Sequence, residues 1–281
     1  MKQQSKPLIG IIILHFGRWE VTKECLDSLE KLEKGSYPLK VVVVNNNQDL
    51  LVEDKLKEHP AVDKIITPEK NFGFASGNNL GIKQCFLWKC DYCLFLNNDT
   101  VVTPSLLSSF LENLPDKPAV LGPVIEHKVR DRTFYDYGGH IDWKRGQPRH
   151  FNKKQYLAEK GVIERDFVSG CCMLIPVKIL ETIGGFKESY FLYLEDVELC
   201  LRAKKWGFKI CLVPKAKIFH KGSQSATELT KIFYSWKNSL KLIWEYVPAK
   251  FKISALVFNT FFYPALFTKW RIKHLYHKFK P

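Results

Sequence analysis

Blocks of apolar and polar residues alternate along the first 125 positions of the chain. Short apolar runs rich in valine and isoleucine are typical of strands buried on both faces of a sheet, and they occur at residues 8–14, 40–44, 64–67 and 92–96. The segments between them predict helices at residues 20–32 and 50–58, from after 77 to about 88, and at 104–113. This alternation predicts an α/β fold with a mostly parallel sheet covered by helices on both faces.

In such a sheet ligands bind beyond the carboxyl ends of the strands, so the residues that follow each strand are the first candidates for a binding site. These positions hold His15, then Asn45 and Asn47, and then Asn97, Asn98 and Asp99. A carboxylate such as that of Asp99 can bind a divalent cation, which in turn can hold a diphosphate. A polar turn that closes the strand would use the same residues, so the residues alone leave both interpretations open.

The loop NFGFASGNNLG, residues 71–81, follows the third predicted strand. Gly73 and Gly77 would let backbone amides approach a ligand closely, and the start of the next helix favours anions. Asn71 and Asn78 add polar side chains to the same loop. The loop matches neither the triphosphate-binding nor the dinucleotide-binding glycine pattern, and a simple entry into the helix is the alternative.

The regular alternation stops after about residue 125. Residues 134–150 contain three glycines and predict a hairpin or an irregular binding loop. Further strands are predicted at 167–175, 209–213 and 216–219, and helices at 195–206 and 228–246. The rest of the chain is basic, aromatic and predicted to be helical.

Two polar features stand out in this second half. Glu195 and Asp196 lie at a predicted helix start, where the helix dipole favours carboxylates and where capping the helix would explain them equally well. The aromatic run 190–193 precedes them and would partly desolvate a carboxylate. Glu198 is expected to be an ordinary surface acid or a support for the pair. His220 follows a short strand, and a lone histidine is more often structural than a ligand.

Charge adds a second theme to this pattern. The chain of 281 residues carries a formal net charge of +14, which suits a nucleic acid, an anionic membrane surface or a phosphate-bearing ligand. Residues 248–281 hold seven Lys or Arg and no Asp or Glu, mixed with bulky apolar residues. That mixture favours an anionic membrane surface over nucleic acid.

Cysteines and the N-terminus say less about function. Most of the eight cysteines lie among apolar residues, which is typical of buried thiols in a reducing compartment. The start of the chain imitates a signal peptide, but its apolar run is short and a buried first strand is the better prediction. No segment reaches the roughly twenty apolar residues of a membrane-spanning helix.

Taken in order, the motifs resemble one family. They are VVVVNNN, NFGFASGNNLG, LFLNNDTVV, VSGCCMLIP, IGGFKESYFLYLEDVELCLRAKKWG and IFHKGS. Their order and spacing over residues 8–240 resemble the family 2 glycosyltransferases with a GT-A fold, in particular the rhamnosyltransferase-like branch. The resemblance predicts a GT-A catalytic domain at residues 1–225 and a helical, basic and aromatic segment at 226–281 with a role at the membrane.

The resemblance also implies roles for individual residues. The acid that recognises the base of the sugar nucleotide would be replaced by Asn45, and the metal-binding motif falls on Asn97, Asn98 and Asp99 with its first acid missing. Asp99 is then the expected ligand of Mg²⁺ or Mn²⁺, and His220 would complete the metal or diphosphate site. Glu195 and Asp196 match the catalytic acid pair, with Asp196 as general base. His15, Asn47, Asn71, Gly73, Gly77 and Asn78 are further expected contacts of the sugar nucleotide.

An inverting, single-addition transfer is the expected reaction, because the motif of processive synthases is absent. The expected donor is a UDP- or dTDP-sugar, and the expected acceptor is a glycan or a polyisoprenyl-phosphate-linked sugar at the inner face of the cell membrane. A nucleotidyltransferase and a non-catalytic sugar- or partner-binding module are the alternatives. The oligomeric state, a homo-oligomer included, is left open.

Overall fold

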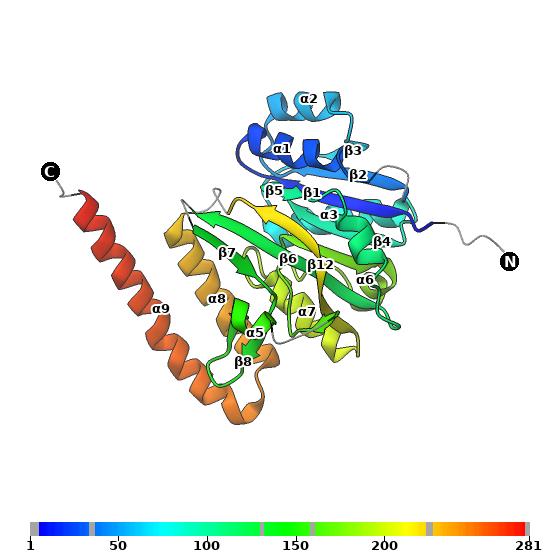
Figure 1. The fold of residues 1–281 in the computed structure, drawn as a ribbon. Helices are drawn as coiled ribbons and strands as arrows, with labels where there is room; N and C mark the ends of the chain where they lie inside the picture. The colour runs from blue at the N-terminus through cyan, green and yellow to red at the C-terminus, as the bar shows by residue number, and fades with distance from the viewer. Residues whose placement is uncertain (1–5, 34–36, 130–131, 158–160, 223–226, 279–281) are drawn as a thin grey trace.

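A computed structural model describes residues 6–33, 37–129, 132–157, 161–222 and 227–278. Its centre is a twisted mixed sheet with the strand order β10-β12-β6-β11-β4-β1-β2-β3. Figure 1 shows this sheet with β2 and β3 toward one side and β6 and β12 toward the other. Helices cover both of its faces, as the alternating pattern predicts. The chain therefore has a mixed α/β fold with a mostly parallel central sheet.

The first half forms the parallel part of the sheet. Strands β1 (Ile9–His15), β2 (Leu39–Asn45), β3 (Lys64–Ile66) and β4 (Tyr92–Asn97) pair in parallel, and β1 lies between β2 and β4. The connecting helices are α1 (Trp19–Leu29), α2 (Leu50–Glu58) and α3 (Gly73–Leu87). β1 is buried along its whole length, which confirms a core strand where the sequence imitates a signal peptide.

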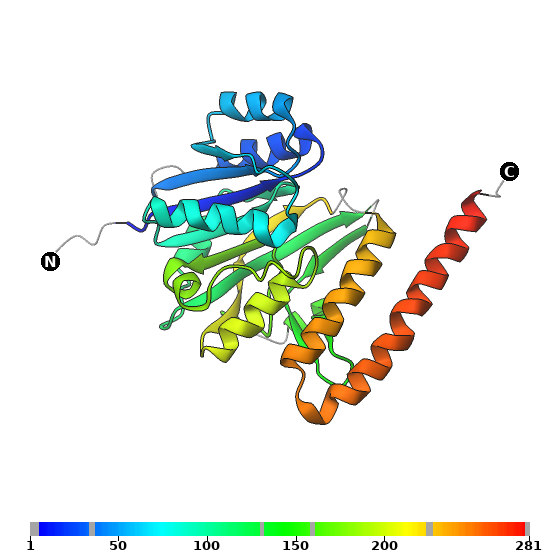
Figure 2. The ribbon, with the colours of Figure 1, turned by 180° about the vertical axis from the view of Figure 1, so that it is seen from behind.

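Strand alternation divides the core into two layers. Ile11 and Ile13 face one layer, with α1, α2 and α4 (Leu106–Leu111). Ile12 and Phe95 face the other, which α3, α6 (Val177–Ile183) and α7 (Glu195–Lys205) cover (Figure 2). All eight cysteines are buried and free, so they fill the core as small apolar groups.

The second half completes the sheet with antiparallel and returning strands. These are β5 (Thr100–Val102), β6 (Ala119–Val129), β7 (Arg132–Asp136), β10 (Ile163–Glu164), β11 (Cys172–Pro176) and β12 (Lys209–His220). β8 (Gly139–Asp142) and β9 (Gln147–His150) form the expected hairpin, followed by the short helix α5 (Lys153–Leu157). β11 is antiparallel to both β4 and β6, whereas β6 and β12 are parallel to each other.

Several predicted boundaries were wrong. α3 begins at Gly73 rather than after residue 77, so Gly77 and Asn78 lie inside the helix. The two short strands predicted at 209–219 are one strand, β12, with a register shift between Val213 and Lys217. β6, an eleven-residue strand near the middle of the sheet, was not predicted at all.

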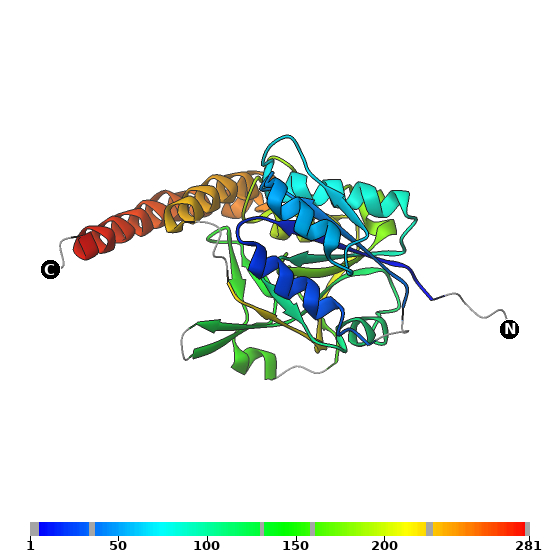
Figure 3. The same cartoon turned by 90° about the horizontal axis from the view of Figure 1, so that it is seen from above.

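The C-terminal segment is helical, as expected. It consists of α8 (Glu228–Tyr246) and α9 (Ala249–Lys278), which turn back on each other in Figures 1 and 2. Trp236 stacks on Tyr263 across the pair, with ring centroids 6.4 Å apart. Figure 3 shows the far end of α9 projecting beyond the sheet. In the described part of the chain no helix is long and apolar enough to cross a membrane.

Candidate active site

A cavity of about 510 Å³ opens at the carboxyl ends of β1, β2 and β4. This volume lies in the range of small-molecule sites, and the position is the one expected for ligands of such a sheet. The strand ends contribute Phe16, Asn46, Asn97, Asn98, Asp99 and His220 to its wall. Further lining comes from residues 169–171, from 191–193, from Glu195 and Asp196, and from the start of α8.

Asp99 and His220 meet because β5 pairs antiparallel with β12, which sets Thr100 opposite His220. His220 Nε2 lies 3.0 Å from Asp99 Oδ1, yet it forms no hydrogen bond with any described residue. His220 Nδ1 lies 3.2 Å from Nδ1 of His127, its neighbour in the register with β6. An imidazole nitrogen and a carboxylate oxygen this close together are a pair of ligand atoms that fits a divalent cation.

The polar residues next to this pair in the cavity lining are hydrogen-bonded to one another. Asn46 Nδ2 donates to Asn71 Oδ1 at 2.7 Å, and the same oxygen accepts from the Gly73 amide at 2.8 Å. Gly73 has φ +86°, and an added Cβ would lie 2.5 Å from the carbonyl oxygen of Phe191. Gly73 is therefore needed where the 71–74 turn touches the segment that leads to Glu195.

Asp196 sits in the first turn of α7 and faces the cavity. Its Oδ2 accepts from the Gly170 amide at 2.8 Å and its Oδ1 from the Val197 amide at 2.8 Å. Gly170 permits this contact, because a Cβ there would lie 2.9 Å from Cβ of Asp196. Burial raises the pKa of Asp196, while the two amide bonds oppose that rise.

Glu195 lines the same cavity in a different environment. It is 6% exposed, and its Oε2 has no partner among the described residues. Burial, and then the neighbouring charge of Asp196, raise its pKa well above the ordinary value. Adjacent carboxyl groups with pKa values shifted to different degrees are a common arrangement in acid–base sites.

Comparison with known proteins identifies the family of this site. The family model described as "Glycosyltransferase like family 2" matches residues 7–255. The chain belongs to this family. It is 23% identical to rhamnosyltransferase WbbL of Escherichia coli over 256 residues, which cover 86% of this chain and 94% of WbbL. It is 26% identical over 210 residues to an N-acetylglucosaminyl-diphospho-decaprenol L-rhamnosyltransferase of Mycobacterium tuberculosis, covering 67% of this chain and 68% of that protein.

Solved structures show the same fold for this glycosyltransferase. GalNAc-T7 with UDP, GalNAc and Mn²⁺ aligns at a TM-score of 0.68 and 14% identity, over 89% of this chain but only 50% of GalNAc-T7. The mannosyltransferase PcManGT of Pyrobaculum calidifontis, with GDP-Man and Mn²⁺, aligns at 0.62 and 14% identity, over 99% and 77% of the two chains. These likenesses establish the GT-A fold.

Five of the residues expected to contact the donor lie outside the cavity lining of this glycosyltransferase. His15 is fully buried, and its Nδ1 lies 2.6 Å from Thr22 Oγ1; burial lowers its pKa to about 4. Asn45 donates to the carbonyl of Asp49 at 3.1 Å, and its buried Oδ1 has no partner among the described residues. Asn47 lies in the turn after β2.

Gly77 and Asn78 have packing roles in α3. A Cβ on Gly77 would lie 2.4 Å from Leu14 Cδ1, so the glycine lets the helix approach β1. Asn78 donates to the carbonyl of Phe74 within the helix at 2.9 Å. Asn98 lines the cavity but also braces it, since its Nδ2 donates to Thr22 Oγ1 at 2.8 Å.

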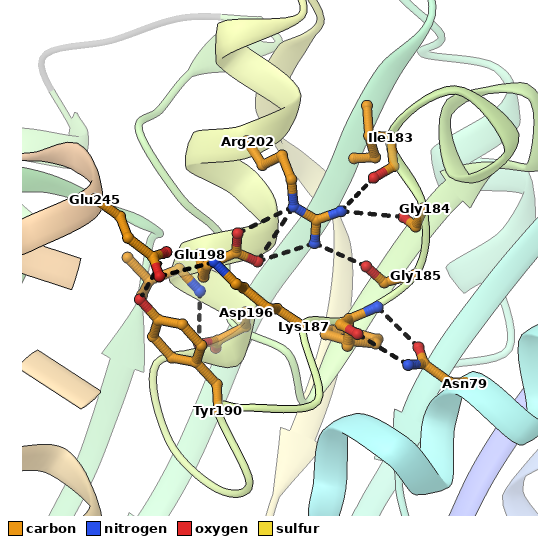
Figure 4. Close-up of polar contacts among 12 residues, drawn as sticks. Asn79, Ile183, Gly184, Gly185, Lys187, Tyr190, Asp196, Glu198, Arg202 and Glu245 are labelled. Atoms are coloured by element: carbon orange, nitrogen blue, oxygen red, sulfur yellow. Dashed lines mark hydrogen bonds and ion pairs between the residues drawn. The ribbon is translucent and has the colours of Figure 1, made fainter. Parts of the chain in front are cut away.

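Glu198 is no surface acid, because its side chain is fully buried. Its carboxylate pairs with Arg202 at 2.9 Å and accepts from the Tyr246 hydroxyl at 2.5 Å. Figure 4 shows the Arg202 guanidinium reaching from this pair to the carbonyls of Ile183, Gly184 and Gly185. The first turns of α7 are thus fastened both to the IGGF loop and to α8.

The aromatic run divides between core and cavity. Tyr190 is fully buried and its hydroxyl donates to Glu245 of α8 at 3.4 Å (Figure 4). Phe191 and Tyr193 line the cavity, and Phe191 stacks on Tyr234 with centroids 5.2 Å apart. Tyr234, like Thr227 and Thr230, comes from the α8 segment, whose apolar periodicity gave no sign of a role in the site.

Proposed function

We propose that the protein is an inverting, single-addition glycosyltransferase that moves a sugar from a UDP- or dTDP-sugar to a hydroxyl group. The main support for this proposal is that a single cavity is lined by two pairs of residues. One pair is Asp99 and His220, and the other is Asp196 and Glu195. The first pair suits the diphosphate that leaves, and the second suits the hydroxyl that attacks. The acceptor we propose is a glycan or a polyisoprenyl-phosphate-linked sugar in cell-surface polysaccharide synthesis, as the names of the relatives suggest.

Asp99 and His220 would hold Mg²⁺ or Mn²⁺ through Oδ1 and Nε2. When bound there, the cation would neutralise charge that builds on the leaving diphosphate. Within the described residues no group of three His, Cys, Asp or Glu side chains gathers to hold a metal. Oxygens of the diphosphate and water would supply further ligands. The structures of GalNAc-T7 and PcManGT, named with Mn²⁺ and a nucleotide or sugar nucleotide, support a divalent cation in this role.

Asp196 would remove the proton of the acceptor hydroxyl as it attacks the anomeric carbon. The Gly170 and Val197 amides hold its two oxygens, and each oxygen keeps a lone pair for the proton. Attack from the face opposite the diphosphate inverts the anomeric centre. Burial raises the pKa of Glu195, and in its protonated form this carboxyl would donate a hydrogen bond to the acceptor.

The C-terminal helices would attach the enzyme to the cytoplasmic face of the membrane. Exposed apolar residues follow one stripe of α8 and continue on α9: Leu229, Phe233, Trp236, Leu240, Trp244, Ile253, Val257 and Phe261. Lys250 and Arg271 on α9 are also exposed and would attract anionic lipid. Because Thr230 and Tyr234 of α8 line the cavity, attachment through this surface would bring a lipid-linked acceptor to the cavity mouth.

Product analysis tests the reaction class directly. The enzyme is incubated with UDP-, dTDP- and GDP-sugars, Mn²⁺ or Mg²⁺, and a lipid-linked acceptor. We expect nucleoside diphosphate and a product with inverted anomeric configuration. Pyrophosphate would indicate nucleotidyl transfer instead, and sugar-nucleotide binding without turnover would indicate a binding module.

A further inference from the structure

The backbone just before Asp196 is held in a rare conformation. Tyr193 and Leu194 both have left-handed dihedrals, with φ of 66° and 67°. Residues with a side chain seldom adopt this region, and two in succession persist only where the surroundings hold them. Leu194 is also the N-cap residue of α7, directly before Glu195, and its side chain makes no capping hydrogen bond. The direction in which Glu195 and Asp196 leave this turn therefore depends on what holds it.

Asn238 of α8 makes the contact that holds the turn. Its Nδ2 donates to the carbonyl of Leu192 at 2.9 Å and to that of Tyr193 at 2.7 Å. The side chain is fully buried, and its Oδ1 has no partner among the described residues. Because both partners are acceptors, only this orientation of the amide is compatible with the contacts.

The carbonyl of Phe191, the residue before Leu192, is held by α3. Phe191 O accepts from the Phe74 amide in α3 at 2.8 Å. Three successive carbonyls, those of Phe191, Leu192 and Tyr193, are thus bound by α3 and α8. The next carbonyl, that of Leu194, accepts the first bond of α7 from the Glu198 amide at 2.9 Å.

We propose that Asn238 is a positioning residue that fixes the left-handed turn and so aims Asp196 at the acceptor. This inference rests on the proposed role of Asp196 as general base. Without the two donors, the carbonyls of Leu192 and Tyr193 lose their hydrogen bonds to α8, and the turn relaxes toward ordinary dihedrals. The carboxylate then shifts relative to the bound donor sugar, while Asp99 and His220 stay in place.

The test compares Asn238→Leu, which lacks both N–H donors, with Asn238→Asp, which loses the amide and can donate at most one hydrogen bond, when protonated. We expect kcat to fall at least tenfold, because a shift of about 1 Å at a reacting group can cost about a hundredfold. The KM for the sugar nucleotide should stay within about threefold of wild type. The acid limb of the pH–rate profile should also move, since the Gly170 bond to Asp196 weakens.

Ser239→Ala is the matched control. Ser239 is the next residue of α8, equally buried, but its hydroxyl lies 2.7 Å from the Tyr263 hydroxyl of α9 rather than on the turn. Its loss should lower the melting temperature and leave kcat and the pH profile unchanged. Nucleoside diphosphate binding, followed by thermal shift, reports on folded protein in every variant.

Two results would overturn the proposal. One is that both Asn238 variants keep the kcat and pH profile of Ser239→Ala. The other is that kcat and nucleotide binding fall together at a temperature well below melting, which would mean general loss of structure. Failure of the proposed function would look different, because the wild-type enzyme itself would then turn over no sugar nucleotide.

Discussion

Asp196 and Glu195 are neighbours in the chain, but the protein surrounds them differently. Asp196 has two backbone amides and an opening to the cavity, whereas Glu195 is buried with a carboxyl oxygen that has no partner among the described residues. Each environment makes a measurable prediction, one for the pH dependence of the reaction and one for the pH dependence of stability.

The pH–rate profile should report the raised pKa of Asp196. A general base must be ionised, so kcat/KM rises as pH passes upward through that pKa. Because burial lifts the pKa above 3.8, the acid limb should lie at a higher pH than for an ordinary aspartate. The measurement is kcat/KM at saturating metal over the range from about pH 4 to about pH 8. A profile with no acid limb within this range would contradict the raised pKa of Asp196.

Glu195→Gln should stabilise the protein, and more so as the pH rises. The folded pKa of Glu195 is raised, so its contribution to stability is intact below the unfolded value and is lost as pH rises through the folded value. Glutamine cannot ionise and escapes that loss. We expect the melting temperature to exceed wild type by a few degrees at about pH 8, roughly 2–4 °C per kcal/mol, and by less at about pH 5. If the melting temperatures of the variant and wild type differed equally at both pH values, this would argue against a buried Glu195 carboxyl with a raised pKa.

At the scale of single residues, the sequence indicated which residue types would gather at the strand ends but not which way each side chain would point. The sequence brought Asn97, Asp99 and His220 forward as site residues, and all three line the cavity. The sequence also brought Asn45 forward, and the structure places Asn46 rather than Asn45 in the cavity lining, where the alternation of side chains ends in the turn after β2. Asn238 left no signal, since its partners are backbone carbonyls 45 and 46 positions away.

At the scale of elements, α3 approaches β1 closely through glycines on one helix face. A Cβ on Gly81 would lie 2.3 Å from Cγ2 of Ile12, a buried and stiff β-branched residue. We expect Gly81→Ala to lose about 1–3 kcal/mol of stability despite the better helix propensity of alanine. Urea unfolding measures this loss, and Lys83→Ala on the exposed face of α3 is the control. A stabilised Gly81→Ala would show that the helix can move away from the strand.

Elements with local signals were predicted well, and those made by distant pairing were not. The first four strands are short apolar runs, and α8 has a clear helical periodicity. β6 and the single long β12 depend on pairing with each other, which begins at Ala119 with Lys209. The predicted strand at 167–175 shortens to β11 because residues 169–171 turn toward the cavity, where Gly170 meets Asp196.

At the scale of the whole molecule, α8 and α9 combine two tasks in our account. α8 contributes to the cavity, and both helices expose apolar residues on the projecting arm seen in Figure 3. Buried polar contacts hold α9 to the body, among them Gln147 Nε2 to Asn259 Oδ1 at 2.5 Å. Removing α9 would expose these groups, so substitutions on its surface test membrane attachment more cleanly than truncation.

The double variant Ile253→Asp with Phe261→Asp should lose flotation with anionic liposomes. These side chains are 78% and 72% exposed, so the fold should tolerate the change while apolar anchoring is lost. Leu87→Asp is the control, because Leu87 of α3 is 77% exposed on the catalytic body. Wild-type flotation should weaken with salt. Flotation of the double variant equal to that of Leu87→Asp would refute attachment through this arm.

Asp196→Asn tests the central claim most directly. The amide keeps the size of the side chain but cannot take the acceptor proton, so transfer should fall by a factor of about 10²–10⁴. Binding of the nucleoside diphosphate with Mn²⁺ should survive, since Asp99 and His220 are untouched, and Asp142→Asn outside the cavity lining should behave like wild type. The measurement is single-turnover transfer with each variant and a matched donor and acceptor. Near-wild-type turnover by Asp196→Asn would contradict the account.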